Sequence, residues 1–164
     1  MKKKEFVVDK LCIVAHPDDE VLWGGANLLS EPGWKVILAT NKNNVTRWKE
    51  LHKTMVLAGV YDVSMYNCID TGNPKKDTLS TCYFSKALQN AAKQKWKLVL
   101  THNSTGEYGH HQHKLVHRLV HKYFKGHNVR DFDFTNKRLP PALLTDKRDL
   151  HKFYAETQNI ARLI

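Results

Sequence analysis

The chain has 164 residues, including 26 lysines and arginines, 16 aspartates and glutamates and 10 histidines. Hydrophobic residues make up 41% of it, and this length and composition are typical of one globular domain spanning 1–164. No apolar stretch approaches the roughly 20 residues of a membrane span, and no signal-peptide core follows Met1, so we expect a cytoplasmic protein. The formal net charge of +10 would attract anions, but the lysines are scattered and no nucleic-acid motif accompanies them, so no specific nucleic acid is expected as a partner.

Short β-branched runs alternate with longer stretches of helical period, which predicts an α/β fold: a Rossmann-like, doubly wound, mostly parallel sheet with helices on both faces. The expected strands are 11–15, 34–40, 63–66, 98–101 and 130–134. The expected helices are 18–29, 45–58, 80–94, 110–124 and 146–161. A strand order of 3-2-1-4-5 would open the loops after strands one and four into one crevice. Residues 16–20 and 102–113 should then face each other.

Three cysteines, Cys12, Cys68 and Cys82, make an odd number without a CxxC pair. This pattern argues against a disulfide framework and against a cysteine-rich zinc module. We therefore expect the cysteines to behave as buried small hydrophobic residues.

A first polar cluster, His16-Pro17-Asp18-Asp19-Glu20, lies where the first strand meets a helix. Acidic residues are favoured at a helix start by the helix dipole, so a purely structural role is one interpretation. That interpretation does not account for a histidine at the end of the strand beside carboxylates. Such a grouping is typical of a divalent metal site with open coordination positions.

A second cluster covers residues 106–113, and His117 and His121 continue it at four-residue intervals along one helix face. A stripe of this kind is more typical of a surface or a pocket wall than of metal ligands. His110 and His113 differ, because both lie at the helix start and can reach the crevice. Two ligands from the first cluster and one from the second would form a His-Asp-His site with room for water, as in catalytic zinc sites.

Both clusters resemble the signature segments of the PIG-L/LmbE-type deacetylases. These enzymes remove acetyl groups from N-acetylglucosamine-containing substrates with a divalent metal. The segments that carry the resemblance are Ala15-His16-Pro17-Asp18-Asp19-Glu20 with Gly24-Gly25, Thr101-His102-Asn103, Gly106-Glu107-Tyr108-Gly109-His110-His111-Gln112-His113, Arg47-Trp48-Lys49-Glu50, and Leu139-Pro140 with residues 154–158.

The resemblance implies a role for individual residues. It implies that His16, Asp19 and His113 bind the metal, Zn²⁺ or another divalent cation such as Fe²⁺, and that Asp18 is the general base. The chemistry of such a site adds that His110, if protonated, stabilises the oxyanion and helps the amine leave, and that Tyr108 donates a hydrogen bond at the same position. Arg47 and Asp70 follow strands two and three and should border the crevice, so we expect both to contact substrate, and the resemblance supports this for Arg47. A surface ion pair with Glu50 is the alternative for Arg47.

Two positions depart from the family pattern. Gln112 stands where bacterial members commonly have an aspartate, so we expect weaker support for a charged His110. His111 replaces a frequent proline, a change for which we have no physical account.

These residues together predict a zinc-dependent N-deacetylase whose partner is an N-acetylated amino sugar, free or carried on a nucleotide, glycan or lipid. The +10 charge leaves a metal-dependent phosphodiesterase or nuclease as one alternative. An inactive relative that binds glycans is another.

Overall fold

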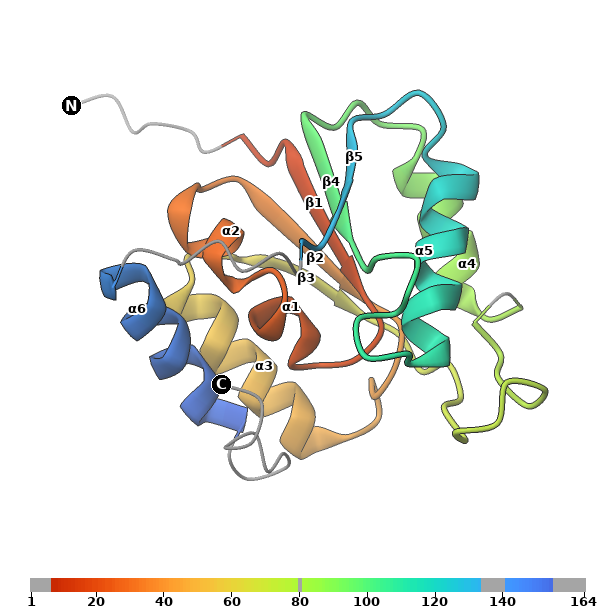
Figure 1. The fold of residues 1–164 in the computed structure, drawn as a ribbon, viewed down its shortest axis with the longest axis horizontal. Helices are drawn as coiled ribbons and strands as arrows, with labels where there is room; N and C mark the ends of the chain where they lie inside the picture. The colour runs from red at the N-terminus through yellow and green to blue at the C-terminus, as the bar shows by residue number, and fades with distance from the viewer. Residues whose placement is uncertain (1–6, 80, 134–140, 155–164) are drawn as a thin grey trace.

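The computed structural model describes residues 7–79, 81–133 and 141–154, whose five strands pair in parallel in one sheet (Figure 1). The strands are β1 (Lys10–Val14), β2 (Trp34–Leu38), β3 (Asp62–Met65), β4 (Leu98–Thr101) and β5 (Val129–Asp131). The helices are α1 (Asp19–Leu22), α2 (Gly25–Ser30), α3 (Val45–Leu57), α4 (Tyr83–Ala91), α5 (His111–Tyr123), α6 (Pro141–His151) and the 3₁₀ turn η1 (Lys152–Tyr154).

The strand order is β3-β2-β1-β4-β5, which confirms the predicted order and the α/β, Rossmann-like class. The winding reverses beside β1, since β2 and β4 are its two neighbours. Every residue of β1 is buried, as expected of a central strand covered on both faces. The loops that follow β1 and β4 therefore emerge side by side at the carboxyl edge of the sheet.

Alternate residues of β1 point into two separate cores. Leu11 and Ile13 pack with apolar residues of α4 and α5. Cys12 and Val14 pack with residues of α1, α2, α3 and α6 on the opposite face. Figure 1 shows the same division, with α4 and α5 on one side of the sheet and the other helices across it.

The prediction of one continuous helix over 18–29 was wrong. The chain forms two short helices there, α1 and α2, which meet at Trp23 and Gly24. A Cβ atom at Gly24 would lie 2.8 Å from the Glu20 carbonyl oxygen and 3.2 Å from the Phe132 ring. Close packing of the backbone against its own preceding turn and against Phe132 therefore requires glycine here. A helical period cannot reveal that contact.

The remaining elements agree with their predicted positions to within a few residues at each end, except at the C-terminal side. The last helix begins at Pro141 and ends at His151, followed by η1, instead of beginning at residue 146. Residues 155–161 of the predicted helix, residue 134 of the fifth strand, and Leu139-Pro140 lie outside the described residues. That 1–164 form one domain stays a prediction. Among the described helices, none is long and apolar enough to cross a membrane.

The expectation for the cysteines was wrong for two of the three. Cys68 and Cys82 form a disulfide, with their Cα atoms 5.9 Å apart. Cys12 is the buried free thiol that was expected. The bridge forms because Cys68 follows β3 and Cys82 precedes α4, so packing of α4 on the sheet brings the two ends of the intervening loop together. An odd number of cysteines permits one bridge and one free thiol, so counting them could not exclude this arrangement.

Candidate active site

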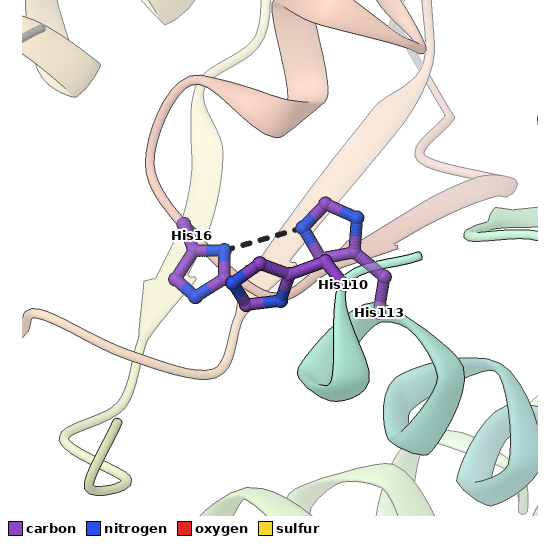
Figure 2. A group of neighbouring side chains, drawn as sticks. All are labelled: His16, His110 and His113. Atoms are coloured by element: carbon purple, nitrogen blue, oxygen red, sulfur yellow. Dashed lines mark hydrogen bonds between the residues drawn. The ribbon is translucent and has the colours of Figure 1, made fainter. Parts of the chain in front are cut away.

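The loops after β1 and β4 meet as predicted. The Ala15 N–H, at the end of β1, donates a hydrogen bond of 3.0 Å to His102 Nε2, which follows β4. His16 Nδ1 lies 3.4 Å from His113 Nε2 at the start of α5 (Figure 2). Residues that are 97 positions apart in the chain thus share one cluster.

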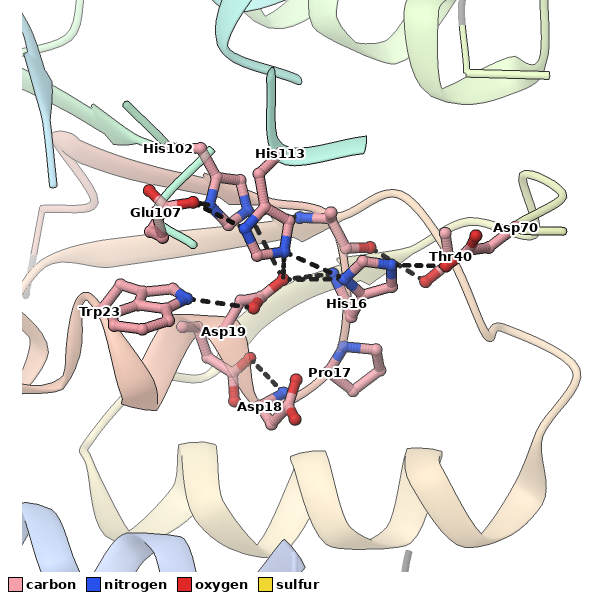
Figure 3. A network of polar contacts seen from close by, with 12 residues as sticks. His16, Pro17, Asp18, Asp19, Trp23, Thr40, Asp70, His102, Glu107 and His113 are labelled. Atoms are coloured by element: carbon pink, nitrogen blue, oxygen red, sulfur yellow. Dashed lines mark hydrogen bonds and ion pairs between the residues drawn. The ribbon is translucent and has the colours of Figure 1, made fainter. Parts of the chain in front are cut away.

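Three potential metal-ligand atoms form a small triangle in this cluster (Figure 3). His16 Nδ1 lies 3.1 Å from Asp19 Oδ2, and His113 Nε2 lies 3.3 Å from the same oxygen. With the 3.4 Å separation between the two nitrogens, all three edges are nearly equal. Ligands about 2.0–2.2 Å from a tetrahedral ion lie roughly 3.3–3.6 Å apart, so the triangle has dimensions that suit such an ion.

Carboxylates fix the tautomer of both histidines. His16 Nε2 lies 2.8 Å from Asp70 Oδ2, and His113 Nδ1 lies 2.6 Å from Glu107 Oε2. Because a carboxylate accepts hydrogen bonds, each of these nitrogens carries a hydrogen. The opposite nitrogens, His16 Nδ1 and His113 Nε2, face Asp19 and are available as ligands once deprotonated. Metal-binding histidines are usually oriented in this way.

His102 is buried in the same cluster but is excluded as a ligand by its own hydrogen bonds. Its Nε2 accepts from the Ala15 N–H, and its Nδ1 donates to Glu107 Oε2 at 2.9 Å. The lone pair is therefore already used, although Nε2 lies 3.5 Å from Asp19 Oδ2. The ring stacks on His113 with centroids 3.8 Å apart, so His102 supports the position of His113.

Positive charge is strongly favoured at the triangle. Burial lowers the pKa of His16, but hydrogen bonds to Asp19 and Asp70 outweigh it and raise the pKa to about 10. Burial also lowers the pKa of His113, but the interactions with Asp19 and Glu107 outweigh it and raise this pKa. Burial opposes ionisation of Asp19 too, yet the charge of His113 holds its pKa well below the ordinary value. The donor set therefore fits a cation that would replace the protons.

Asp18 lies beside this triangle with its carboxylate turned toward Arg47. Its Oδ2 atom lies 3.8 Å from Arg47 Nη1, which also donates to the Pro17 carbonyl oxygen. Burial, followed by the charge of Asp19, raises the pKa of Asp18 well above its ordinary value, whereas Arg47 lowers it. Arg47 thus reaches the cluster from the first turn of α3, where Asn44 caps the helix.

The backbone around Asp18 is unusual, with φ at 119° in a residue that is not glycine. Its N–H donates to Glu20 Oε2 at 3.0 Å, and the Tyr154 hydroxyl donates to the other Glu20 oxygen. Glu20 is fully buried, and burial raises its pKa to about 7. Sequence reasoning treated Glu20 as a possible helix-start residue; the structure makes it the anchor of the turn that presents Asp18 and Asp19.

His110 and Tyr108 line the rim of the cluster. Burial and the charges of His16 and His113 lower the pKa of His110 to about 4, so this ring is neutral at pH 7 instead of protonated. Its ring centroid lies 4.9 Å from that of His16 (Figure 2). The Tyr108 ring is 62% exposed, and partial burial followed by the charges of Asp19 and Asp18 raises its pKa to about 12. Both side chains can therefore donate hydrogen bonds in their neutral forms.

This geometry agrees with the comparisons with known proteins. Residues 11–124 match the family model described as PIG-L, GlcNAc-PI de-N-acetylase. The chain belongs to the PIG-L family. It is also 28% identical over 176 residues to uncharacterized protein L374 of Acanthamoeba polyphaga mimivirus, a match that covers 96% of this chain and 76% of that protein. The predicted resemblance is thereby confirmed.

Solved structures of low sequence identity share the PIG-L fold of this chain. The conserved protein TT1542 of Thermus thermophilus has a TM-score of 0.62 at 15% identity, over 91% of this chain and 80% of that one. The N,N'-diacetylchitobiose deacetylase of Pyrococcus horikoshii, complexed with its inhibitor MPG, has a TM-score of 0.62 at 19% identity. The match covers 91% of this chain and 70% of that one. The A40926 pseudoaglycone deacetylase Dbv21 has a TM-score of 0.60 at 16% identity, over 94% of this chain and 84% of that one.

The two departures from the PIG-L pattern have clear structural surroundings. Gln112 is fully buried, and its Nε2 donates to the Ile69 carbonyl oxygen at 3.1 Å. An aspartate could not donate this bond, so Gln112 holds the loop that carries Asp70. His111 Nε2 pairs with Asp77 Oδ2 in the same loop. Both residues therefore attach the β3–α4 loop to α5.

Proposed function

We propose that this PIG-L family member is a metal-dependent N-deacetylase that hydrolyses the N-acetyl group of an N-acetylglucosamine-type sugar and releases acetate. The observation that carries the proposal is the near-equilateral triangle of His16 Nδ1, Asp19 Oδ2 and His113 Nε2. Membership of a family of deacetylases supports the reaction class.

In this proposal His16, Asp19 and His113 hold one divalent cation, with Zn²⁺ or Fe²⁺ as the candidates. Such an ion supplies a lowered pKa for bound water and polarisation of the amide carbonyl. Asp70 and Glu107 keep His16 and His113 in the tautomers that the site needs. The Trp23 indole N–H donates to the second Asp19 oxygen at 3.2 Å and so orients that carboxylate.

Asp18 is the proposed general base. A carboxylate whose pKa is raised by burial accepts a proton more readily than an exposed one. Arg47 preserves the ionised form that is needed at the start of the reaction. The proton taken from water can then pass to the departing amine.

Neutral His110 and Tyr108 are the proposed hydrogen-bond donors to the oxyanion that forms on the acetyl carbonyl. Arg47 remains a proposed substrate contact, since its guanidinium lies at the edge of the site. Both oxygens of Asp70 already accept hydrogen bonds, Oδ2 from His16 and Oδ1 from the Gly72 N–H at 3.1 Å. We propose that the main role of Asp70 is to orient His16, with substrate contact through the remaining lone pairs.

Acetate release from N-acetylglucosamine, from nucleotide-linked and lipid-linked forms, and from short N-acetylated glycans tests this function. We expect release by the Zn²⁺- or Fe²⁺-loaded protein, and its loss after treatment with a chelator. Asp18→Asn should lower kcat by roughly 10²–10⁴-fold, because general base catalysis contributes about that much.

Asp149→Asn is the matched control, because Asp149 is an exposed carboxylate whose ion-pair partner among the residues that the structure describes is Lys152. Release that persists in chelator, or an Asp18→Asn protein with full activity, would contradict the mechanism. Binding of the metal without release from any of these sugars would contradict the substrate class.

A further inference from the structure

A second cluster of metal-type ligands lies on α5 outside the active site. His117 Nε2 lies 3.2 Å from Asp131 Oδ2, and His121 Nε2 lies 2.8 Å from Asp131 Oδ1. The two imidazole rings lie with their centroids 4.3 Å apart. The histidines are spaced i, i+4 on the helix, and the aspartate ends the neighbouring strand β5.

We propose that His117, His121 and Asp131 form a surface binding site for a divalent transition-metal ion. One ligand atom from each residue can be chosen so that all three lie within 4.8 Å of one another. The i, i+4 spacing places both rings on one helix face, where two imidazoles can converge on a single ion. Imidazole nitrogens and a carboxylate oxygen suit Zn²⁺, Ni²⁺ and Cu²⁺.

The protonation of the cluster also suits a cation. Each Nε2 faces a carboxylate oxygen and so carries a hydrogen, which an ion would replace. Burial lowers the pKa of His117, so a cation competes more easily with the proton of this ring. The side chains of His117, His121 and Asp131 are 17%, 43% and 36% exposed, which leaves room for water to complete the coordination.

This site is separate from the catalytic triangle. His117 and His121 follow His113 by four and eight residues, which places them about 6 and 12 Å further along the helix axis. Asp131 belongs to β5, an outer strand of the described sheet that pairs with β4. A bound ion would therefore join α5 to the edge of the sheet, and we expect it to stabilise the fold without taking part in deacetylation.

Calorimetric titration of the full chain with Ni²⁺ and with Zn²⁺ tests the proposal. The wild type should bind two ions per chain. His117→Gln/His121→Gln should bind one and keep its deacetylase activity, whereas His52→Gln, which removes an exposed histidine of α3, should still bind two. His113→Gln should lose the catalytic ion and retain the surface one, so failure of this site and failure of the proposed function give different results.

A thermal melt provides a second measurement that does not depend on counting ions. Added Ni²⁺ should raise the Tm of the His113→Gln protein, and Asp131→Asn in that background should abolish the increase. A His117→Gln/His121→Gln protein that binds as many ions as the wild type would overturn the proposal, whereas a wild type that binds one ion and loses it in this variant would contradict only the catalytic metal site.

Discussion

A single buried carboxylate, Glu107, organises much of the candidate metal centre. Its Oε2 atom accepts from His102 and His113, and its Oε1 atom accepts from the Asn103 N–H at 2.9 Å. The backbone of Glu107 has φ at 58°, a left-handed conformation that is uncommon outside glycine. Burial opposes its ionisation, but the hydrogen bonds from His102 and His113 lower its pKa to about 2.

Glu107→Gln should weaken metal binding by about 10–100-fold, because the amide replaces one charged acceptor with a donor and no longer fixes the His113 tautomer. Competition with a coloured chelator measures this affinity, and circular dichroism reports whether the fold is retained. Asp62→Asn is the control, since Asp62 pairs with Lys35 on the sheet edge. Equal affinities for the Glu107→Gln protein and the wild type would show that Glu107 does not orient the ligand.

Among the secondary-structure elements, α1 carries Asp19 at its first position and is interrupted before α2 at Trp23 and Gly24. Gly24 and Gly25 are adjacent in sequence but differ in their surroundings. A Cβ at Gly24 would meet a backbone oxygen at 2.8 Å, whereas a Cβ at Gly25 would meet the flexible Lys147 side chain at 3.2 Å. Only the first contact requires the backbone to move.

Gly24→Ala should therefore destabilise the protein by about 1–3 kcal/mol, as expected for overpacking against rigid atoms. For a chain of this size that change lowers Tm by roughly 2–4 °C for each kcal/mol. Gly25→Ala is the matched control, and its stability should be unchanged or higher, since alanine favours a helix more than glycine does. Differential scanning calorimetry of both variants compares them, and equal Tm values would contradict this role for Gly24.

Across the protein as a whole, the carboxylates of the site link stability to pH. The hydrogen bond from His16 lowers the pKa of Asp70 to about 2, and Glu107 has a similar value. Both groups regain their ordinary values, 3.8 and 4.5, on unfolding. The unfolded chain then binds more protons in this range, so their contribution is present above about pH 4.5 and is lost as the pH falls toward 2.

The metal-free protein should therefore become easier to unfold with urea as the pH is lowered from about 5 to about 3. The slope should be shallower in Glu107→Gln, which has no carboxylate to protonate at that position. Glu31→Gln, which changes an exposed partner of Lys10, should keep the wild-type slope. A Glu107→Gln protein with the full wild-type pH dependence would show that this buried carboxylate is not the source of the effect.

Local patterns in the chain were sufficient to predict the layered α/β fold and the strand order. They also predicted that the two histidine-containing loops face each other. An apolar run such as 11–15 must be buried, and parallel strands place their following loops at one edge of the sheet. The motif residues His16, Asp19 and His113 were found for the same reason, because their order and separation are visible in the chain. Their assignment as metal ligands remains a proposal.

The groups that surround those motifs became evident only from the packing of distant segments. The break at Gly24 depends on Phe132, which lies more than a hundred residues away, and the Cys68–Cys82 bridge depends on how α4 packs on the sheet. The same is true of two hydrogen-bonded contacts, Asp70 with His16 and Gln112 with the Ile69 carbonyl. Each of these contacts joins segments that only packing brings within hydrogen-bonding or van der Waals distance, so no local period or spacing encodes them.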